Sequence, residues 1–171
     1  MGALDGRVVV VTGGNGGIGL GMAKACAEAG APIAIWARNE GKNAAAATEL
    51  EALGANVVTP VCYVAEEAEV VASTEATLEA FGRIDSLIAN AGVGGGGKIT
   101  EMPLAEWRRV TSVNLDGVFL CFREVGRHLV ERNEGGSLIA ISSASAIHGA
   151  PRMQHYASSK AGVLALVRGT A

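Results

Sequence analysis

Short apolar runs alternate along the chain with longer segments whose apolar residues recur at helical spacing. The short runs predict five strands, at 7–12, 32–37, 56–62, 84–90 and 136–143. The longer segments predict helices at 17–29, 41–53, 66–81, about 103–132 with a break near its start, and 156–169. Because the apolar residues of the strands are consecutive rather than alternating, we expect strands that are buried on both faces.

Five strand–helix units in succession predict an α/β fold. Right-handed crossovers then give a doubly wound parallel sheet of Rossmann-like type, in three α/β/α layers, with strand order 3-2-1-4-5. No internal repeat or linker interrupts the chain, so we expect one domain over 1–171. The fifth strand and its helix would lie at an uncovered edge. We therefore expect a chain without its final strands: a fragment, a chain whose tail is not observed, or a protein that a partner completes.

Composition narrows the classes of function. The chain has 171 residues, of which 49% are apolar and 4% aromatic, and its net charge of −3 gives no support for a nucleic-acid or anionic-membrane partner. Three cysteines lie in apolar runs without metal-ligand spacing, so we expect free thiols in a reducing compartment and no metal site. No run approaches 18 apolar residues and no signal-peptide pattern is present, which favours a cytoplasmic protein that does not span a membrane.

A glycine-rich stretch at 12–19, Thr-Gly-Gly-Asn-Gly-Gly-Ile-Gly, joins the first predicted strand to the first helix. A helix that begins there has unpaired N–H groups and a positive dipole end, which together attract phosphate. Glycines let a pyrophosphate approach the backbone closely. The alternative is an ordinary glycine turn between a strand and a helix.

The end of the second strand carries Arg38, which lies 19 residues after Gly19, next to the neutral Ala37. In dinucleotide-binding folds an acidic residue at about this distance binds the ribose hydroxyls of NAD, whereas an arginine accommodates the 2′-phosphate of NADP. A guanidinium suits the second role because it binds phosphate in a bidentate manner and stacks on adenine. The alternative is a solvated arginine. Lys42 is placed to assist.

Tyr156 and Lys160 are spaced i, i+4 and so share one face of the last predicted helix. A neighbouring ammonium favours the phenolate, which would let the tyrosine exchange a proton with an alcohol or alkoxide. Ser143 ends the fifth strand, 13 residues before Tyr156, where a doubly wound fold presents its ligands. Ser142 is the alternative, but neighbouring strand residues point in opposite directions.

Taken together, these motifs resemble the short-chain dehydrogenase/reductase family in its single-domain form, over the whole chain. The TGxxxGxG pattern of that family is matched by Thr12, Gly13, Gly17 and Gly19, and its NAG motif by Asn90, Ala91 and Gly92. Its helix-four asparagine is matched by Asn114, and its Ser–Tyr–Lys set by Ser143, Tyr156 and Lys160.

The resemblance implies NAD(P)-dependent interconversion of a ketone and a secondary alcohol, with NADP preferred and NAD possible. Tyr156 would be the general acid/base, and Ser143 would hold the substrate oxygen. Lys160 would lower the pKa of Tyr156 and bind nicotinamide-ribose hydroxyls, and Asn114 would hold a water in a proton relay from Lys160. The implied cofactor-binding set is Thr12, Gly13, Asn15, Gly17, Ile18, Gly19, Arg38, Val64, Asn90, Ala91, Gly92, Tyr156 and Lys160.

The resemblance also implies a homodimer or homotetramer through the helices at about 103–132 and 156–169. Three departures stand beside it. Tyr63 occupies the position of an aspartate that holds the adenine amino group in the family. Gly16, rather than a basic residue, precedes Gly17. Family members also run longer, and the additional part would hold the last two strands and the substrate lid.

Two rival functions follow from these departures. A non-catalytic nucleotide-binding or interaction module of the same fold is the first. An epimerase or dehydratase of the extended relatives is the second, although those carry a GxxGxxG pattern that 12–19 does not match. Among weaker candidates, His148 and His155 are interpreted as solvated loop histidines, and the glycine run at 94–97 as a loop at the mouth of the pocket.

Overall fold

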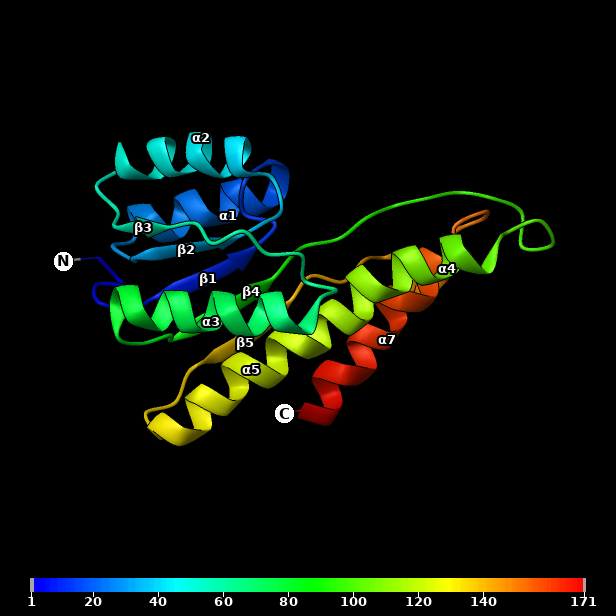
Figure 1. Cartoon of the computed structure of the whole chain (residues 1–171). Helices are drawn as coiled ribbons and strands as arrows, with labels where there is room; N and C mark the ends of the chain where they lie inside the picture. Colours follow the sequence, from blue (N-terminus) through cyan, green and yellow to red (C-terminus); the bar gives the residue numbers. More distant parts are fainter. Residues whose placement is uncertain (1, 171) are drawn as a thin grey trace.

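A five-stranded parallel sheet lies at the centre of the molecule, in the order β3-β2-β1-β4-β5 (Figure 1). The computed structural model describes residues 2–170, so the first and last residues of the expected 1–171 domain lie outside it. The strands are β1 (Val9–Thr12), β2 (Ile33–Trp36), β3 (Val57–Val58), β4 (Ser86–Ala89) and β5 (Ser137–Ala140). The predicted strand order is confirmed. Successive strands are added on one side of β1 up to β3 and on the other side from β4 onward, so the order reverses between β1 and β4.

Helices cover both faces of the sheet (Figure 1). The two on one face are α1 (Gly17–Glu28) and α2 (Glu40–Glu51). Those associated with the other face are α3 (Glu67–Phe81), α5 (Gly117–Arg132) and α7 (Gln154–Thr170). Between them lie α4 (Leu104–Thr111), the π-helical turn η1 (Ser112–Asp116) and the short α6 (Ser145–His148). The helix α4 packs against α7 and extends away from the sheet.

Alternate residues of each strand pack into different hydrophobic cores, one on each face of the sheet. Val9, Val11 and Ile33 pack into the core beneath α1 and α2. Val10 and Leu87 belong to the core beneath α3, α5 and α7. Successive strand side chains point to opposite faces, so burial of both faces requires continuous apolar runs. This is the physical reason that the strands could be recognised from the sequence.

Several elements differ from the sequence expectation, and one is the short helix α6, which carries His148 where a loop was expected. The segment expected as one broken helix at 103–132 is α4 and α5 joined by η1, a wider turn of the kind often found at functional sites. β3 has only two residues, because Pro60 has no N–H to donate to the sheet. The last helix begins at Gln154, two residues earlier than predicted, which places His155 on the helix rather than in a loop.

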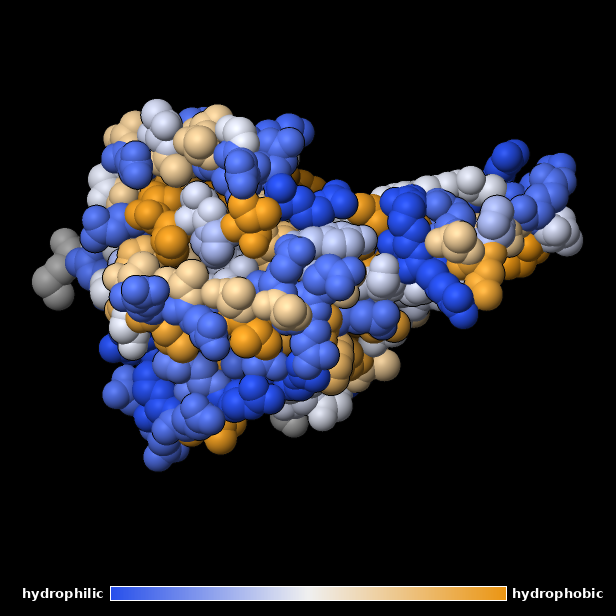
Figure 2. Space-filling model, viewed as in Figure 1, coloured by the Kyte–Doolittle hydropathy of each residue, from blue (hydrophilic) through white to orange (hydrophobic). Residues whose placement is uncertain are grey.

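The surface mixes polar and apolar side chains, with exposed apolar residues scattered over several elements (Figure 2). The strands β3 and β5 are the two edges of the sheet, and Ile139 on β5 is 46% exposed. Of the helices between residues 2 and 170, not one combines the length and the apolar character needed to cross a bilayer.

The amino ends of β1, β4 and β5 meet at a buried carboxylate, that of Asp85. The N–H of Val8 donates to Asp85 Oδ2 over 2.9 Å, while the backbone of Asp85 bonds to Val8 O and to the N–H of Ser137. Arginine nitrogens lie 2.6–3.2 Å from the same carboxylate; they belong to Arg7, Arg83 and Arg132. Burial opposes ionisation of Asp85, but the hydrogen bonds from Arg83, Val8 and Arg7 outweigh it and lower its pKa to about 2.

Replacing this carboxylate should destabilise the fold in a pH-dependent way. A lowered pKa means that the ionised group stabilises the fold above its unfolded pKa of about 4, and that this stabilisation is lost as the pH falls toward 2. We expect Asp85→Asn to lower the free energy of unfolding by roughly 2 kcal/mol at pH 7. The difference from the wild type should shrink at pH 4 and again at pH 3 in urea titrations. A difference that stays constant over this range would contradict the assignment.

Candidate functional site

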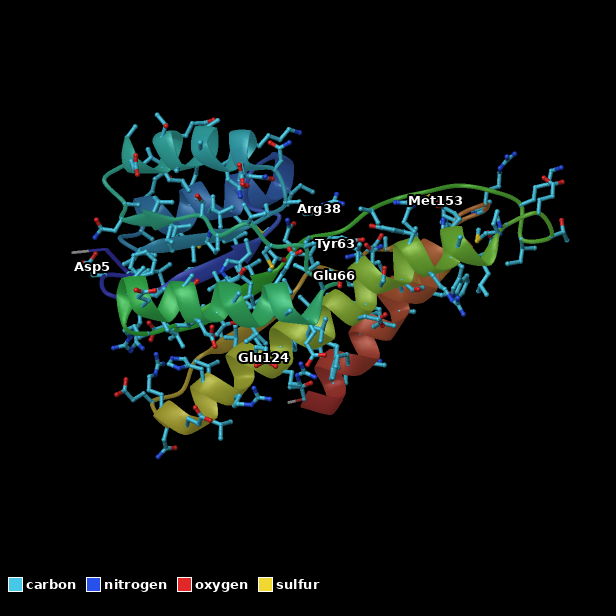
Figure 3. All side chains as sticks on the ribbon, in the orientation of Figure 1. Asp5, Arg38, Tyr63, Glu66, Glu124 and Met153 are labelled. Carbon is cyan, nitrogen blue, oxygen red and sulfur yellow. The ribbon has the colours of Figure 1, made fainter. Side chains whose placement is uncertain are left out.

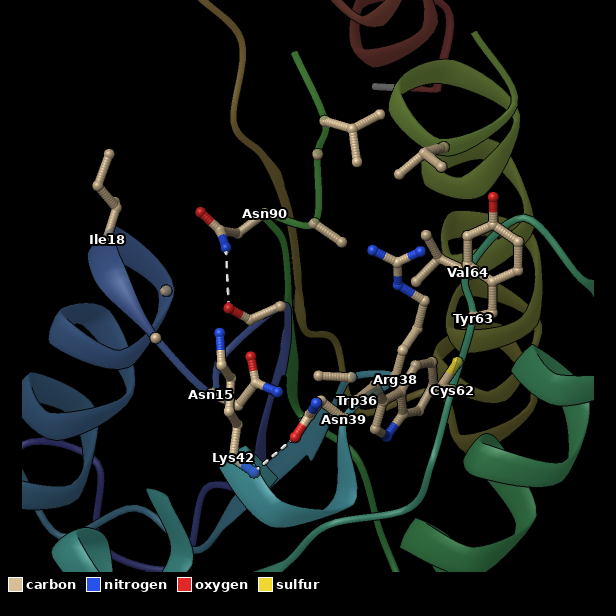
Figure 4. Close-up of a pocket in the computed structure, with 18 residues that line it drawn as sticks. Asn15, Ile18, Trp36, Arg38, Asn39, Lys42, Cys62, Tyr63, Val64 and Asn90 are labelled. Carbon is tan, nitrogen blue, oxygen red and sulfur yellow. Dashed lines mark hydrogen bonds between the residues drawn. The ribbon is translucent and has the colours of Figure 1, made fainter. Parts of the chain in front are cut away.

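A cleft of about 420 Å³ opens at the carboxyl ends of β1, β2 and β4, where Arg38 and Tyr63 lie close together (Figures 3 and 4). A parallel sheet presents its ligand site at this edge, beside the point where the strand order reverses. The predicted cofactor residues that line the cleft are Gly13, Asn15, Ile18, Gly19, Arg38, Val64, Asn90, Ala91 and Gly92. Thr12 and Gly17 do not line it, nor do Tyr156 and Lys160.

The amino end of α1 forms one wall of the cleft. No side chain caps this helix, and its first turn contains no acidic residue. Its first N–H groups are therefore available to an anion. Ile18, in that first turn, is 74% exposed and also borders the cleft. The backbone of Gly19 lies against the Gly13 carbonyl and the Asn90 amide, which leaves no room for a side chain at that position.

Thr12 and Asn90 join the ends of β1 and β4. The buried hydroxyl of Thr12 accepts hydrogen bonds from the N–H groups of Asn90, over 3.0 Å, and Ala91, over 2.9 Å. Asn90 Nδ2 donates in return to the carbonyl of Thr12 over 3.0 Å. It also donates to the carbonyl of Gly13 over 3.4 Å (Figure 4). The side chain of Thr12 thus holds together the two strand ends that border the cleft, although it does not line the cleft itself.

Asparagine side chains form hydrogen bonds around the part of the cleft next to α2. Asn43, buried on α2, donates to the Ala37 carbonyl over 2.8 Å and accepts from Asn15 Nδ2 over 2.7 Å. Asn39 caps α2 by accepting from the N–H of Lys42 over 2.8 Å. Asn39 and Asn43 were absent from the predicted site, whereas Lys42 was expected to assist Arg38 and lines the cleft. For Asn43 a signal existed, because it shares helical spacing with the buried Ala46 and Leu50.

Lys160 on α7 bonds to the segment that follows β5, and Ser143 belongs to that segment. Tyr156 lies one turn earlier on α7. Lys160 is buried, its Nζ donates to the Ile141 carbonyl over 2.7 Å, and it lies 6.0 Å from the centroid of the Tyr156 ring. Burial lowers the pKa of Lys160. Ser142 and Ser143 have different partners, since Ser142 Oγ donates to the Lys160 carbonyl whereas Ser143 Oγ accepts from Ser145 Oγ over 2.9 Å.

Asn114 connects this group to the cleft through the π-helical turn η1. Its buried amide pairs with both backbone groups of Val93, over 2.8 and 3.0 Å, and donates to Ser159 Oγ over 3.2 Å. A Cβ added at Gly92 would lie 3.3 Å from Asn114 Oδ1 and 3.6 Å from Lys160 Nζ. Gly92 therefore lies between the cleft and the buried lysine.

The prediction that His155 is a solvated loop residue is wrong. His155 is fully buried, and its Nε2 lies 3.4 Å from Glu106 Oε1 on α4. Arg109 pairs with the same carboxylate and donates to the Gly94 carbonyl over 2.7 Å. The glycine run at 94–97 passes so close to this cluster that a Cβ on Gly95 would overlap it. Sequence spacing gave no signal for these contacts between distant segments.

The chain matches known proteins over nearly its full length. A family model described as short chain dehydrogenase matches residues 7–171. L-rhamnose 1-dehydrogenase (NAD(P)(+)) of Sphingomonas sp. (strain SKA58) is 34% identical over 172 residues, which cover 100% of this chain and 68% of that protein. Levodione reductase of Leifsonia aquatica is 39% identical over 168 residues, covering 96% of this chain and 62% of that protein.

A solved structure gives the same match in three dimensions. It is a short chain dehydrogenase/reductase from Burkholderia phymatum in complex with NAD, with a TM-score of 0.95 and 33% identity. The match covers 99% of this chain and 60% of that one. The chain thus spans between 60% and 68% of the length of these three proteins.

Two alanine substitutions in α1 should have opposite effects on stability. In Gly19→Ala the added Cβ would overlap Gly13 O and lie 2.6 Å from Asn90 Nδ2, so we expect a loss of about 1–3 kcal/mol in the free energy of unfolding. Gly21→Ala is the matched control, because nothing lies within 4 Å of its Cβ and helix propensity favours alanine by up to about 1 kcal/mol. Urea unfolding followed by circular dichroism measures both, and equal midpoints would refute the close approach at Gly19.

Proposed function

The chain belongs to the short-chain dehydrogenase/reductase family, and from that premise we propose that it forms the cofactor-binding and catalytic part of an NAD(P)-dependent oxidoreductase acting on a ketone and its secondary alcohol. The observation that carries the proposal is Gly92, which lies between the cleft and the buried pair of Asn114 and Lys160. The dehydrogenase and reductase names of the relatives support the same chemistry.

The residues of the cleft fit a nicotinamide dinucleotide. We propose that the pyrophosphate binds the uncapped amino end of α1 beside Asn15 and Ile18, with Gly13, Gly17 and Gly19 permitting its approach. Thr12 stabilises this proposed pyrophosphate site by accepting hydrogen bonds from the N–H groups of Asn90 and Ala91. The proposed contacts beyond the pyrophosphate are Val64 near the adenine and Asn90, Ala91 and Gly92 toward the nicotinamide. We propose that Tyr156 and Lys160, outside the cleft lining, also contact the nicotinamide end.

The bound cofactor supplies or accepts the hydride, and the protein moves the proton. We propose that the Tyr156 hydroxyl donates its proton to the developing alkoxide, or removes one in the reverse direction. Lys160, on the next turn of α7, lies 6.0 Å from the centroid of the Tyr156 ring, and we propose that it binds the ribose hydroxyls beside the nicotinamide. Ser143 would donate to the substrate oxygen, because its Oγ accepts from Ser145 and its own hydrogen stays available. Asn114 would hold a water that passes a proton from Lys160.

Arg38 supports a preference for NADP over NAD. Its guanidinium borders the cleft and has no hydrogen bond or carboxylate partner between residues 2 and 170. All of its N–H groups are therefore available to a 2′-phosphate. Lys42 adds a second positive charge to the same wall, and no acidic side chain lines the cleft.

The proposal extends to assembly and location. We propose one domain over 1–171, a small-molecule substrate, and a homodimer or homotetramer through α5 and α7. Phe119 and Val130, both exposed on α5, support the helical interface. We also propose the cytoplasm as the location, which is supported by the three free thiols of Cys26, Cys62 and Cys121.

Removing the hydroxyl of Tyr156 should separate chemistry from cofactor binding. Tyr156→Phe is expected to lower turnover by about 10²–10⁴-fold, since the ring remains and only the proton donor is lost. The dissociation constant for NADPH should change little. Ser158→Ala, an exposed position on the same helix, is the matched control. Turnover is measured on a panel of ketones and secondary alcohols, and near-normal activity of Tyr156→Phe would refute the mechanism.

The cofactor preference is tested at Arg38. Wild-type protein should bind NADPH more tightly than NADH in a fluorescence titration. Arg38→Ala should weaken NADPH binding by about 10–100-fold, because charged hydrogen bonds to the phosphate are lost, and should leave NADH binding nearly unchanged. Arg168→Ala, an exposed arginine outside the cleft, is the control. Tighter binding of NADH by the wild type would overturn the preference.

A further inference from the structure

The segments that carry Arg38 and Tyr63 are held side by side by their backbones. A parallel bridge pairs Ala37 with Val61, and the N–H of Cys62 donates to the Ala37 carbonyl over 3.2 Å. This bridge continues the pairing of β2 and β3 beyond Pro60. Consequently both side chains enter the same wall of the cleft, where Figure 4 shows them next to each other.

The backbone of Tyr63 is fixed on both sides. Its N–H donates to Glu69 Oε2 over 2.6 Å, and its carbonyl accepts from the N–H of Glu66 over 2.8 Å, in a turn that leads into α3. The neighbouring side chains of Cys62 and Val64 are buried. The ring of Tyr63 therefore projects into the cleft from a rigid support.

The guanidinium of Arg38 lies over that ring. Arg38 Cζ is 5.0 Å from the ring centroid, within the range of a cation–π contact. The ring occupies one face of the guanidinium but takes none of its in-plane N–H groups. A carboxylate at position 63 would instead attract those N–H groups and repel a phosphate. The Glu69 carboxylate, the acidic group that contacts Tyr63, is engaged by the Tyr63 N–H.

We propose that Tyr63 is a positioning residue for Arg38 and thereby determines selectivity for a cofactor that carries a 2′-phosphate. The inference rests on the proposed NADP preference. It attributes the size of that preference to Arg38 and Tyr63 together instead of to Arg38 alone. A flexible arginine loses conformational freedom when it binds phosphate. The ring holds the guanidinium in place before the cofactor arrives, so part of that loss has already occurred.

The test is the ratio of NADPH affinity to NADH affinity in Tyr63 variants. Tyr63→Leu keeps an apolar side chain without the aromatic face, and we expect it to lower the ratio about two- to five-fold, the range of an exposed cation–π contact. Tyr63→Phe is the matched control and should retain the wild-type ratio, because the ring face remains. NADH affinity should stay unchanged in both variants.

A double-mutant cycle shows whether Tyr63 acts through Arg38. Tyr63→Leu in an Arg38→Ala background should cause no further loss of NADPH affinity. Calorimetry with adenosine 2′,5′-bisphosphate against AMP repeats the comparison without the nicotinamide end. Tyr63→Glu is a second variant, and it should lower the ratio further than Tyr63→Leu because its carboxylate would pair with Arg38.

Three results would overturn the inference. An unchanged ratio in Tyr63→Leu or Tyr63→Glu would show that the ring does not position Arg38. Equal weakening of NADPH and NADH would mean that the ring contacts the adenine itself. An additive loss in the double variant would separate Tyr63 from Arg38. The wild-type ratio tests the NADP preference separately, so its failure can be distinguished from failure at Tyr63.

Discussion

The cleft depends on one buried hydroxyl, that of Thr12, where β1 and β4 end. The chain leaves the two strands in different directions there, so backbone N–H groups that no longer pair in the sheet must find other acceptors. Thr12 Oγ1 accepts from two of them, at Asn90 and Ala91, and Asn90 returns hydrogen bonds to the β1 side. The glycine loop and the segment toward Gly92 thus hold a fixed separation, and the contacts proposed for the pyrophosphate and for Asn90, Ala91 and Gly92 lie along those two segments.

Local patterns were sufficient to predict the fold. Five continuous apolar runs, each followed by a helical pattern, specify a parallel sheet covered on both faces, and the order β3-β2-β1-β4-β5 follows from the handedness of the connections. The errors came from interactions that periodicity does not contain. Pro60 shortened β3, and the π-helical turn at 112–116 preserves helical spacing well enough to be hidden in the pattern.

Some residues of the site could be predicted from the sequence and others could not, because local spacing again does not contain contacts between distant segments. Residues within recognisable motifs, such as Arg38 and Asn90, line the cleft as expected. Asn43 and His155 were missed or misread because they have partners far away in the sequence, in the glycine loop before α1 and on α4. Such contacts depend on how helices pack, which a single sequence does not encode in its spacing. Asn114 was recognised by resemblance, but its pairing with Val93 became visible only in the fold.

Cys62 has a chemical consequence for the cleft. Its thiol borders the cavity directly before Tyr63, and burial raises the pKa of Cys62 to about 11. At neutral pH only about one such thiol in ten thousand is ionised, and thiolate is the form that reacts with peroxides and alkylating agents. The wall of the cleft that Tyr63 borders therefore carries a buried thiol that is almost entirely protonated at neutral pH.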